Sequence, residues 1–168
     1  MDPITDRWFK AARRKMRTWT RMVFTKRTLL VFLAVSLLAQ FLQPDRTAPT
    51  SLPGSDLIAL TMPRDSVAGL LRAACYDCHS NSTTYPWYSY ITPVNFWLER
   101  HVDEGRDELN LSEWGAHKEK WQRHKAREAV EMLQDGSMPP DSYTLLHGEA
   151  RLDEAERREL IALFEELR

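Results

Sequence analysis

The 168-residue chain has only two cysteines, Cys75 and Cys78, which lie three positions apart. A structural disulfide across two intervening residues would be unusual, and no second cysteine pair is present to complete a zinc site. The sequence also lacks internal repeats, low-complexity segments and any stretch that we would assign to a β-strand. No pattern indicates an activated serine or cysteine nucleophile, so the sequence does not suggest an enzyme.

The total charge is close to zero, at −1, but it is unevenly distributed. Residues 1–27 carry nine Lys and Arg against two Asp, a net charge of +7. Residues 43–168 carry 14 Lys and Arg against 22 Asp and Glu, a net charge of −8. The acidic main part of the chain gives no support to nucleic-acid binding, and it favours a basic protein as a partner.

Both cysteines belong to the C-x-x-C-H pattern formed by Cys75, Cys78 and His79. This pattern is typical of covalent c-type haem attachment. On a helical turn, both thiols can form thioethers with one macrocycle, and the imidazole emerges on the same side to bind its iron. A C-x-x-C redox pair normally follows a strand, whereas an amphipathic helix precedes this one. An apolar stripe runs through the motif, which predicts a haem inside the fold: Val67, Leu70, Leu71, Ala74, Cys75 and Cys78.

One long apolar run is present, over the 15 residues 28–42. It is shorter than the roughly 20 residues of a comfortable membrane span. However, the basic segment before it is longer than that of a usual signal peptide, and no good small-x-small cleavage site follows. We therefore expect a retained, single-pass anchor in the cytoplasmic membrane. The positive-inside rule places residues 1–27 in the cytoplasm and the rest on the periplasmic side, where c-type haem is attached.

Four segments are expected: a basic head (1–27), the anchor (28–42), a Pro-rich linker (43–63) and a haem-binding domain (64–168). The linker should hold the domain at some distance from the bilayer. Helices are predicted from about Asp65 to the motif, over 94–109, near 117–134 with Gly136 as its stop, and from the N-cap Asp153 onward. The second helix has this apolar stripe: Val94, Trp97, Leu98, His101, Val102 and Leu109. The predicted fold class is a small all-α domain behind an N-terminal transmembrane helix.

A six-coordinate haem needs a second ligand opposite His79, and Met138 is the preferred candidate. It precedes Pro139 and Pro140 in a loop, and Pro139 keeps its backbone extended. Met/His ligation is common in small cytochromes. Met62 lies in the linker, and Met132 lies in a helix where packing is the expected role. The rivals are His101 on the second helix and, more weakly, His147, while an open sixth site is the remaining alternative.

Several further blocks make the chain resemble the bacterial haem-binding domain family, which carries one C-x-x-C-H motif, often behind a membrane anchor. The blocks are 75–81, 85–89, Pro93-Val94, 101–106, 109–114, 138–140 and 143–147, within a likeness that covers about residues 57–168. The resemblance implies a cytochrome-c-like domain with covalent haem through Cys75 and Cys78 and with His79 as axial ligand. Gly148 stands where the family is expected to have proline, a difference that affects only the local loop conformation.

These observations predict a membrane-anchored, extracytoplasmic cytochrome with one covalent haem c, which transfers single electrons to or from a redox partner. His79 and Met138 are the predicted iron ligands. The alternative is a haem-based sensor or ligand-binding module with an open sixth site. A third interpretation, a structural anchor with an incidental zinc site, would show zinc and no iron on elemental analysis.

Overall fold

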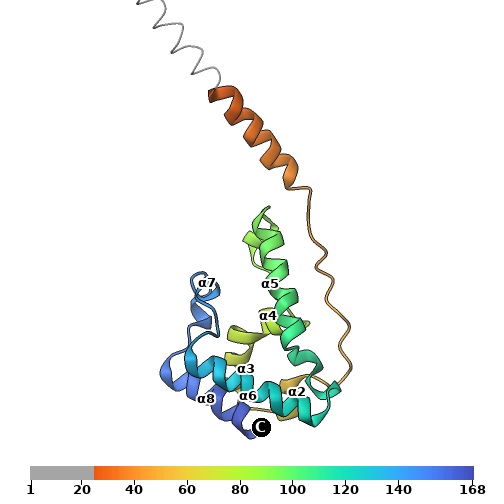
Figure 1. Cartoon of the computed structure of the whole chain (residues 1–168), viewed down its shortest axis with the longest axis vertical. Coiled ribbons are helices and arrows are strands. Elements are labelled where there is room, and N and C mark those ends of the chain that lie inside the picture. Colours follow the sequence, from red (N-terminus) through yellow and green to blue (C-terminus); the bar gives the residue numbers. More distant parts are fainter. Residues whose placement is uncertain (1–24) are drawn as a thin grey trace, which may run out of the picture.

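The computed structural model describes residues 25–168, which form helices and connecting loops without a strand (Figure 1). The all-α prediction is therefore confirmed for this part of the chain. The elements after the N-terminal helix are α2 (Leu57–Thr61), α3 (Asp65–Leu71), the π-helical turn η1 (Arg72–Tyr76), α4 (Asp77–His79), the 3₁₀ turn η2 (Trp87–Tyr90), α5 (Val94–Glu108), η3 (Leu111–Ala116), α6 (Glu119–Asp135), α7 (Asp141–Thr144), η4 (Gly148–Ala150) and α8 (Glu154–Glu166).

The core forms where α3, α6 and α8 pack together, with α2 and η3 covering one side. It is apolar and fully interior: Leu57, Val67, Leu71, Tyr76, Leu111, Trp114, Ala126, Val130, Leu133, Leu160 and Phe164. Leu57 has no exposed surface, although it lies in the predicted linker. The folded domain therefore starts before the predicted boundary at residue 64.

Helix ends follow the local signals in the sequence. Gly136 ends α6 in the left-handed conformation, at φ 76°. The Asp153 side chain accepts hydrogen bonds from the amides of Ala155 and Glu156, and the Glu156 carboxylate accepts one from the Asp153 amide, which completes a capping box. Asp65 is the first residue of α3 instead of its cap, because Arg64 occupies the cap position.

The predicted buried stripe of α5 is wrong in its first half. Val102 is buried, but His101 and Trp97 are exposed, and Asn95 and Glu99 are buried instead. The reason is tertiary: the first turns of α5 extend beyond the domain, as Figure 1 shows, and have no helix of the core against their apolar side. Periodicity identified an amphipathic helix but not the neighbours that cover it.

The N-terminal helix is described over residues 25–39, and large apolar side chains on all its sides are exposed. Within residues 25–168, no helix is long and apolar enough to cross a membrane. The basic head, residues 1–27, lies almost wholly outside the described residues. The chain after this helix runs back alongside the domain toward α2 (Figure 1), so it does not act as a spacer between the helix and the domain.

A close approach between α4 and α5 determines how the domain presents its C-x-x-C-H segment. A Cβ atom added at Gly105 of α5 would lie 2.7 Å from the Cys78 carbonyl oxygen, a distance that no real side chain tolerates. Glycine is required here because two backbones meet directly.

We expect Gly105→Ala to lower the free energy of unfolding by about 1–3 kcal/mol, because α5 must move away from α4. The measurement is urea unfolding of the full chain. Gly69→Ala is the matched control, since a Cβ atom there meets nothing within 4 Å and alanine in a helix is worth about 0.5–1 kcal/mol over glycine. Equal stability of the two variants would contradict the proposed steric role of Gly105.

Candidate functional site

The C-x-x-C-H segment lies across a change of helix type. Cys75 is in the π-helical turn η1, and Cys78 and His79 are in the short helix α4 that follows. Single π-helical turns inside helices occur frequently at functional sites. The extra residue per turn changes the directions in which the side chains of the motif leave the helix.

The imidazole of His79 is held by α5. Its Nδ1 lies 2.8 Å from the carbonyl oxygen of Gly105 and 3.1 Å from that of Leu109. Because carbonyl oxygens only accept, Nδ1 carries the proton and Nε2 keeps a free lone pair. Burial lowers the pKa of His79, so the ring is neutral near pH 7. This is the arrangement by which proteins prepare a histidine to bind a metal.

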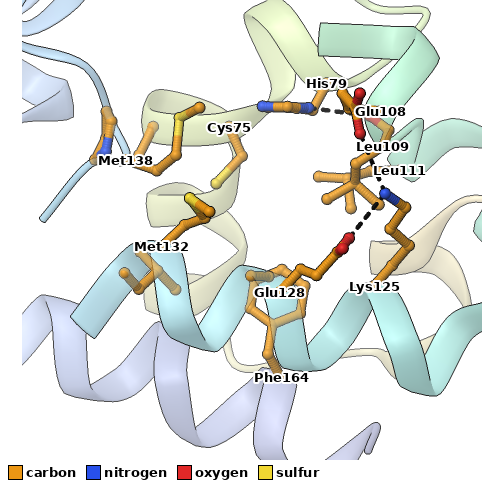
Figure 2. Close-up of a pocket in the computed structure, with 14 residues that line it drawn as sticks. Cys75, His79, Glu108, Leu109, Leu111, Lys125, Glu128, Met132, Met138 and Phe164 are labelled. Carbon is orange, nitrogen blue, oxygen red and sulfur yellow. Dashed lines mark hydrogen bonds and ion pairs between the residues drawn. The ribbon is translucent and has the colours of Figure 1, made fainter. Parts of the chain in front are cut away.

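His79 lines a cavity of about 300 Å³, shown in Figure 2. Apolar side chains of η1, η3, α6, α8 and the loops form most of its wall: Ala74, Leu109, Leu111, Ala129, Leu133, Pro139 and Phe164. Three sulfur atoms are also present, from Cys75, Met132 and Met138. An imidazole nitrogen and soft sulfur atoms in an apolar cavity are ligands suited to haem iron.

The two cysteines of the motif line two neighbouring cavities. Cys75 lines the cavity of His79, whereas Cys78 lines a neighbouring cavity of about 120 Å³. Burial raises the pKa of Cys75 to about 12 and that of Cys78 to about 11. Both thiols are therefore protonated at neutral pH.

Met138 lines the cavity from the loop after α6, and Met132 lines it as well. The two side chains are 37% and 40% exposed and lie on the same side of Cys75 in Figure 2. The Met138 amide donates to the Met132 carbonyl at 3.2 Å. The Ser137 hydroxyl lies 3.0 Å from the sulfur of Met132. The sequence analysis assigned Met132 to packing, and only the reversal of the chain at Gly136 brings it beside Met138.

His101 and His147 lie outside the cavity of His79. Both line the smaller cavity, together with Cys78. His101 Nδ1 is bonded to the Trp97 carbonyl of its own helix at 2.9 Å. His147 Nε2 lies 2.6 Å from the Tyr88 hydroxyl, and its ring stacks on Tyr143 at 4.2 Å. Neither His101 nor His147 therefore lies at the cavity that His79 and Met138 line.

A charged cluster closes one side of the larger cavity. Lys125 Nζ lies 2.8 Å from Glu128 and 3.3 Å from Glu108, and all three residues line the wall (Figure 2). The bond to Glu128 raises the pKa of Lys125, and the same contact lowers the pKa of Glu128. Sequence analysis missed this cluster: the i,i+3 spacing signals the pair within α6, but the approach of α5 that brings Glu108 has no local signal.

The loop that carries Met138 is tied to the C-x-x-C-H segment through Asp77, the residue before Cys78. The Tyr143 hydroxyl donates to Asp77 Oδ2 at 2.8 Å and lies 3.2 Å from the Ala73 carbonyl. The other Asp77 oxygen accepts from the Thr84 amide at 2.9 Å. Burial and the Asp77 carboxylate raise the pKa of Tyr143, so its hydroxyl remains a donor. The Asp77 carboxylate therefore connects the C-x-x-C-H segment to α7, through Tyr143, and to the loop after α4, through Thr84.

Comparison with known proteins identifies one family. The family model described as a haem-binding domain matches residues 34–166, which is most of the chain. No curated protein and no solved structure matches the chain.

We expect Tyr143→Phe to lower the free energy of unfolding by about 1–2 kcal/mol, because it leaves a partly buried carboxylate oxygen without its donor. Urea unfolding of the full chain measures this. Tyr90→Phe is the control, since the Tyr90 hydroxyl has no hydrogen bond within residues 25–168 and its loss should leave stability within about 0.5 kcal/mol. A loss no larger than that of the control would show that Tyr143 does not hold the loop.

Proposed function

Because the chain belongs to the haem-binding domain family, we propose that it is a membrane-anchored, extracytoplasmic c-type cytochrome that transfers single electrons. Haem binding is the property of the family. The covalent attachment, the ligands, the redox role and the location are our proposals.

One observation carries the proposal: a cavity that brings together the free Nε2 side of His79, the thiol of Cys75 and the thioether of Met138. These residues fit a haem. His79 would bind the iron through Nε2, and Met138 would bind from the loop. Cys75 from this cavity and Cys78 from the neighbouring one would hold the macrocycle by thioethers. The apolar wall would exclude water from the iron, and a bound haem would supply a one-electron couple.

The chain's own groups favour electron transfer over catalysis. Gly105 and Leu109 fix the tautomer and orientation of His79, so the ligand needs no rearrangement when the charge of the iron changes. Met/His ligation raises the reduction potential. The acidic surface outside the cavity would guide a basic redox partner by long-range attraction.

Membrane attachment is proposed from the N-terminal part. Residues 29–42 expose nearly every large apolar side chain that they carry, and nine Lys and Arg lie within the first 27 residues. An exposed apolar helix is costly in water. The basic head would keep the N-terminus in the cytoplasm and place the haem domain on the other side.

Covalent attachment can be tested on the full chain produced in a host that attaches c-type haem. We expect the haem to remain with the protein after acid–acetone denaturation, because thioether bonds survive it. The Cys75→Ser/Cys78→Ser double variant should lose all its colour under the same treatment. Extraction of haem from the wild type would show that the haem is not covalently bound.

The second ligand can be tested with Met138→Ala against Met132→Ala and His101→Ala. We expect only Met138→Ala to abolish the weak sulfur-to-iron band of the ferric protein and to lower the reduction potential, since a soft thioether favours ferrous iron. The reduced variant should then bind carbon monoxide readily. Loss of the band in Met132→Ala instead would reassign the ligand. A wild type without the band, and with rapid carbon monoxide binding, would favour the ligand-binding alternative.

A further inference from the structure

Large apolar side chains gather, exposed, at the N-terminal end of α5 and in the turn η2 before it. We call this group the α5 tip: Trp87, Tyr90, Ile91, Phe96 and Trp97. Trp87 is 76% exposed, and Phe96 and Trp97 are 46% and 47% exposed. Contiguous exposed apolar surface on a folded domain marks an interaction site. The first turns of α5 extend beyond the core helices (Figure 1), and Trp97 also lines the cavity that Cys78 lines.

The segment that forms the α5 tip also carries no charge. Residues 80–98 contain no Asp, Glu, Lys or Arg, although 36 such residues are present in residues 43–168. Charge returns at once after the tip, with Glu99 and Arg100. A neutral, aromatic-rich segment within an acidic domain suits an apolar neighbour. On its inner side, the Arg46 guanidinium lies 4.4 Å from the centroid of the Tyr90 ring.

The α5 tip is fastened to the end of the exposed N-terminal helix. The Gln40 side chain exchanges hydrogen bonds with the backbone of Thr92, at 3.0 and 3.3 Å. The Asn95 amide donates to the Leu42 carbonyl at 3.0 Å, and the Gln43 amide donates to the Tyr90 carbonyl at 3.2 Å. Asn95 is fully buried by these contacts. Whatever environment covers the apolar helix at Leu42 therefore extends over the α5 tip.

A lipid bilayer is the environment that fits both surfaces. The helical part of the apolar run, residues 28–39, is about 18 Å long, against the roughly 30 Å of a hydrocarbon core. Trp and Tyr, which have an apolar ring and a polar tip, concentrate at the boundary between hydrocarbon and headgroups. An aromatic cluster at the end of a short apolar helix supplies the apolar surface that the helix lacks.

We propose that the α5 tip inserts into the interface of the membrane that carries the N-terminal helix, so that the domain lies against the bilayer. The proposal rests on the membrane attachment proposed above. It replaces the expectation that the linker holds the domain away from the membrane. It also places the cavity shared by Cys78 and Trp97 at the membrane side of the domain.

The test uses the full haem-loaded chain in vesicles of phosphatidylethanolamine and phosphatidylglycerol that contain a phospholipid with a photoreactive diazirine on its acyl chain. After irradiation, mass spectrometry locates the labelled peptides. We expect label in residues 29–42 and in residues 87–97, and none in residues 111–121, whose Trp114 and Trp121 serve as an internal control. Label in residues 29–42 alone would overturn the inference and keep the anchor. Absence of label from both segments would contradict the membrane anchor as well as the insertion of the α5 tip.

Variants test whether the apolar side chains of the α5 tip are what contacts the lipid. In Ile91→Ser/Phe96→Ser we expect label in residues 87–97 to fall severalfold, with residues 29–42 unchanged. Leu60→Ser is the control: Leu60 is 48% exposed but lies on α2, away from the α5 tip. Haem content and urea unfolding establish that each variant is folded. Unchanged label in the double variant would show that the α5 tip does not contact lipid.

Discussion

The packing of α4 directly on α5 is the constraint on which the site depends. Gly105 lets the two backbones meet at Cys78, and this contact brings the Gly105 and Leu109 carbonyls within hydrogen-bonding distance of His79 Nδ1. Gly105 thus provides both the space in which the two helices meet and a carbonyl oxygen that accepts a hydrogen bond from His79. The tautomer of His79, and with it the free side of the ring, is a consequence of the meeting of two helices and not of the motif alone.

Two polar connections hold the walls of the cavities around this contact. Asp77 joins the motif to Tyr143 and to Thr84, and Lys125 joins α6 to α5 through Glu108. Between them, the wall is apolar apart from its sulfur atoms. This division suits a large, flat, apolar cofactor with a metal at its centre, because charge is kept at the edge and soft ligands lie inside.

The arrangement relates the haem domain to the N-terminal helix in a definite way. Gln40, Gln43 and Asn95 fasten the end of the helix to the loop before α5, so the domain does not swing on a free tether. If the helix lies in a membrane, the orientation of the domain follows from these bonds, and the α5 tip faces the lipid. Under the proposed function, a redox partner in the same membrane would then meet a fixed side of the protein.

The sequence by itself determined the features that depend on neighbours along the chain. The C-x-x-C-H motif, the helical class, the stop at Gly136 and the capping box at Asp153 were all predictable, because their physical causes act within four or five residues. The tertiary structure decided the rest. Met132 lines the cavity together with Met138, and His101 and His147 lie outside it. Cys78 lines a second cavity, and Leu57, from the predicted linker, lies in the core. These outcomes depend on which helices meet, and local periodicity contains no information about the partner that covers a face.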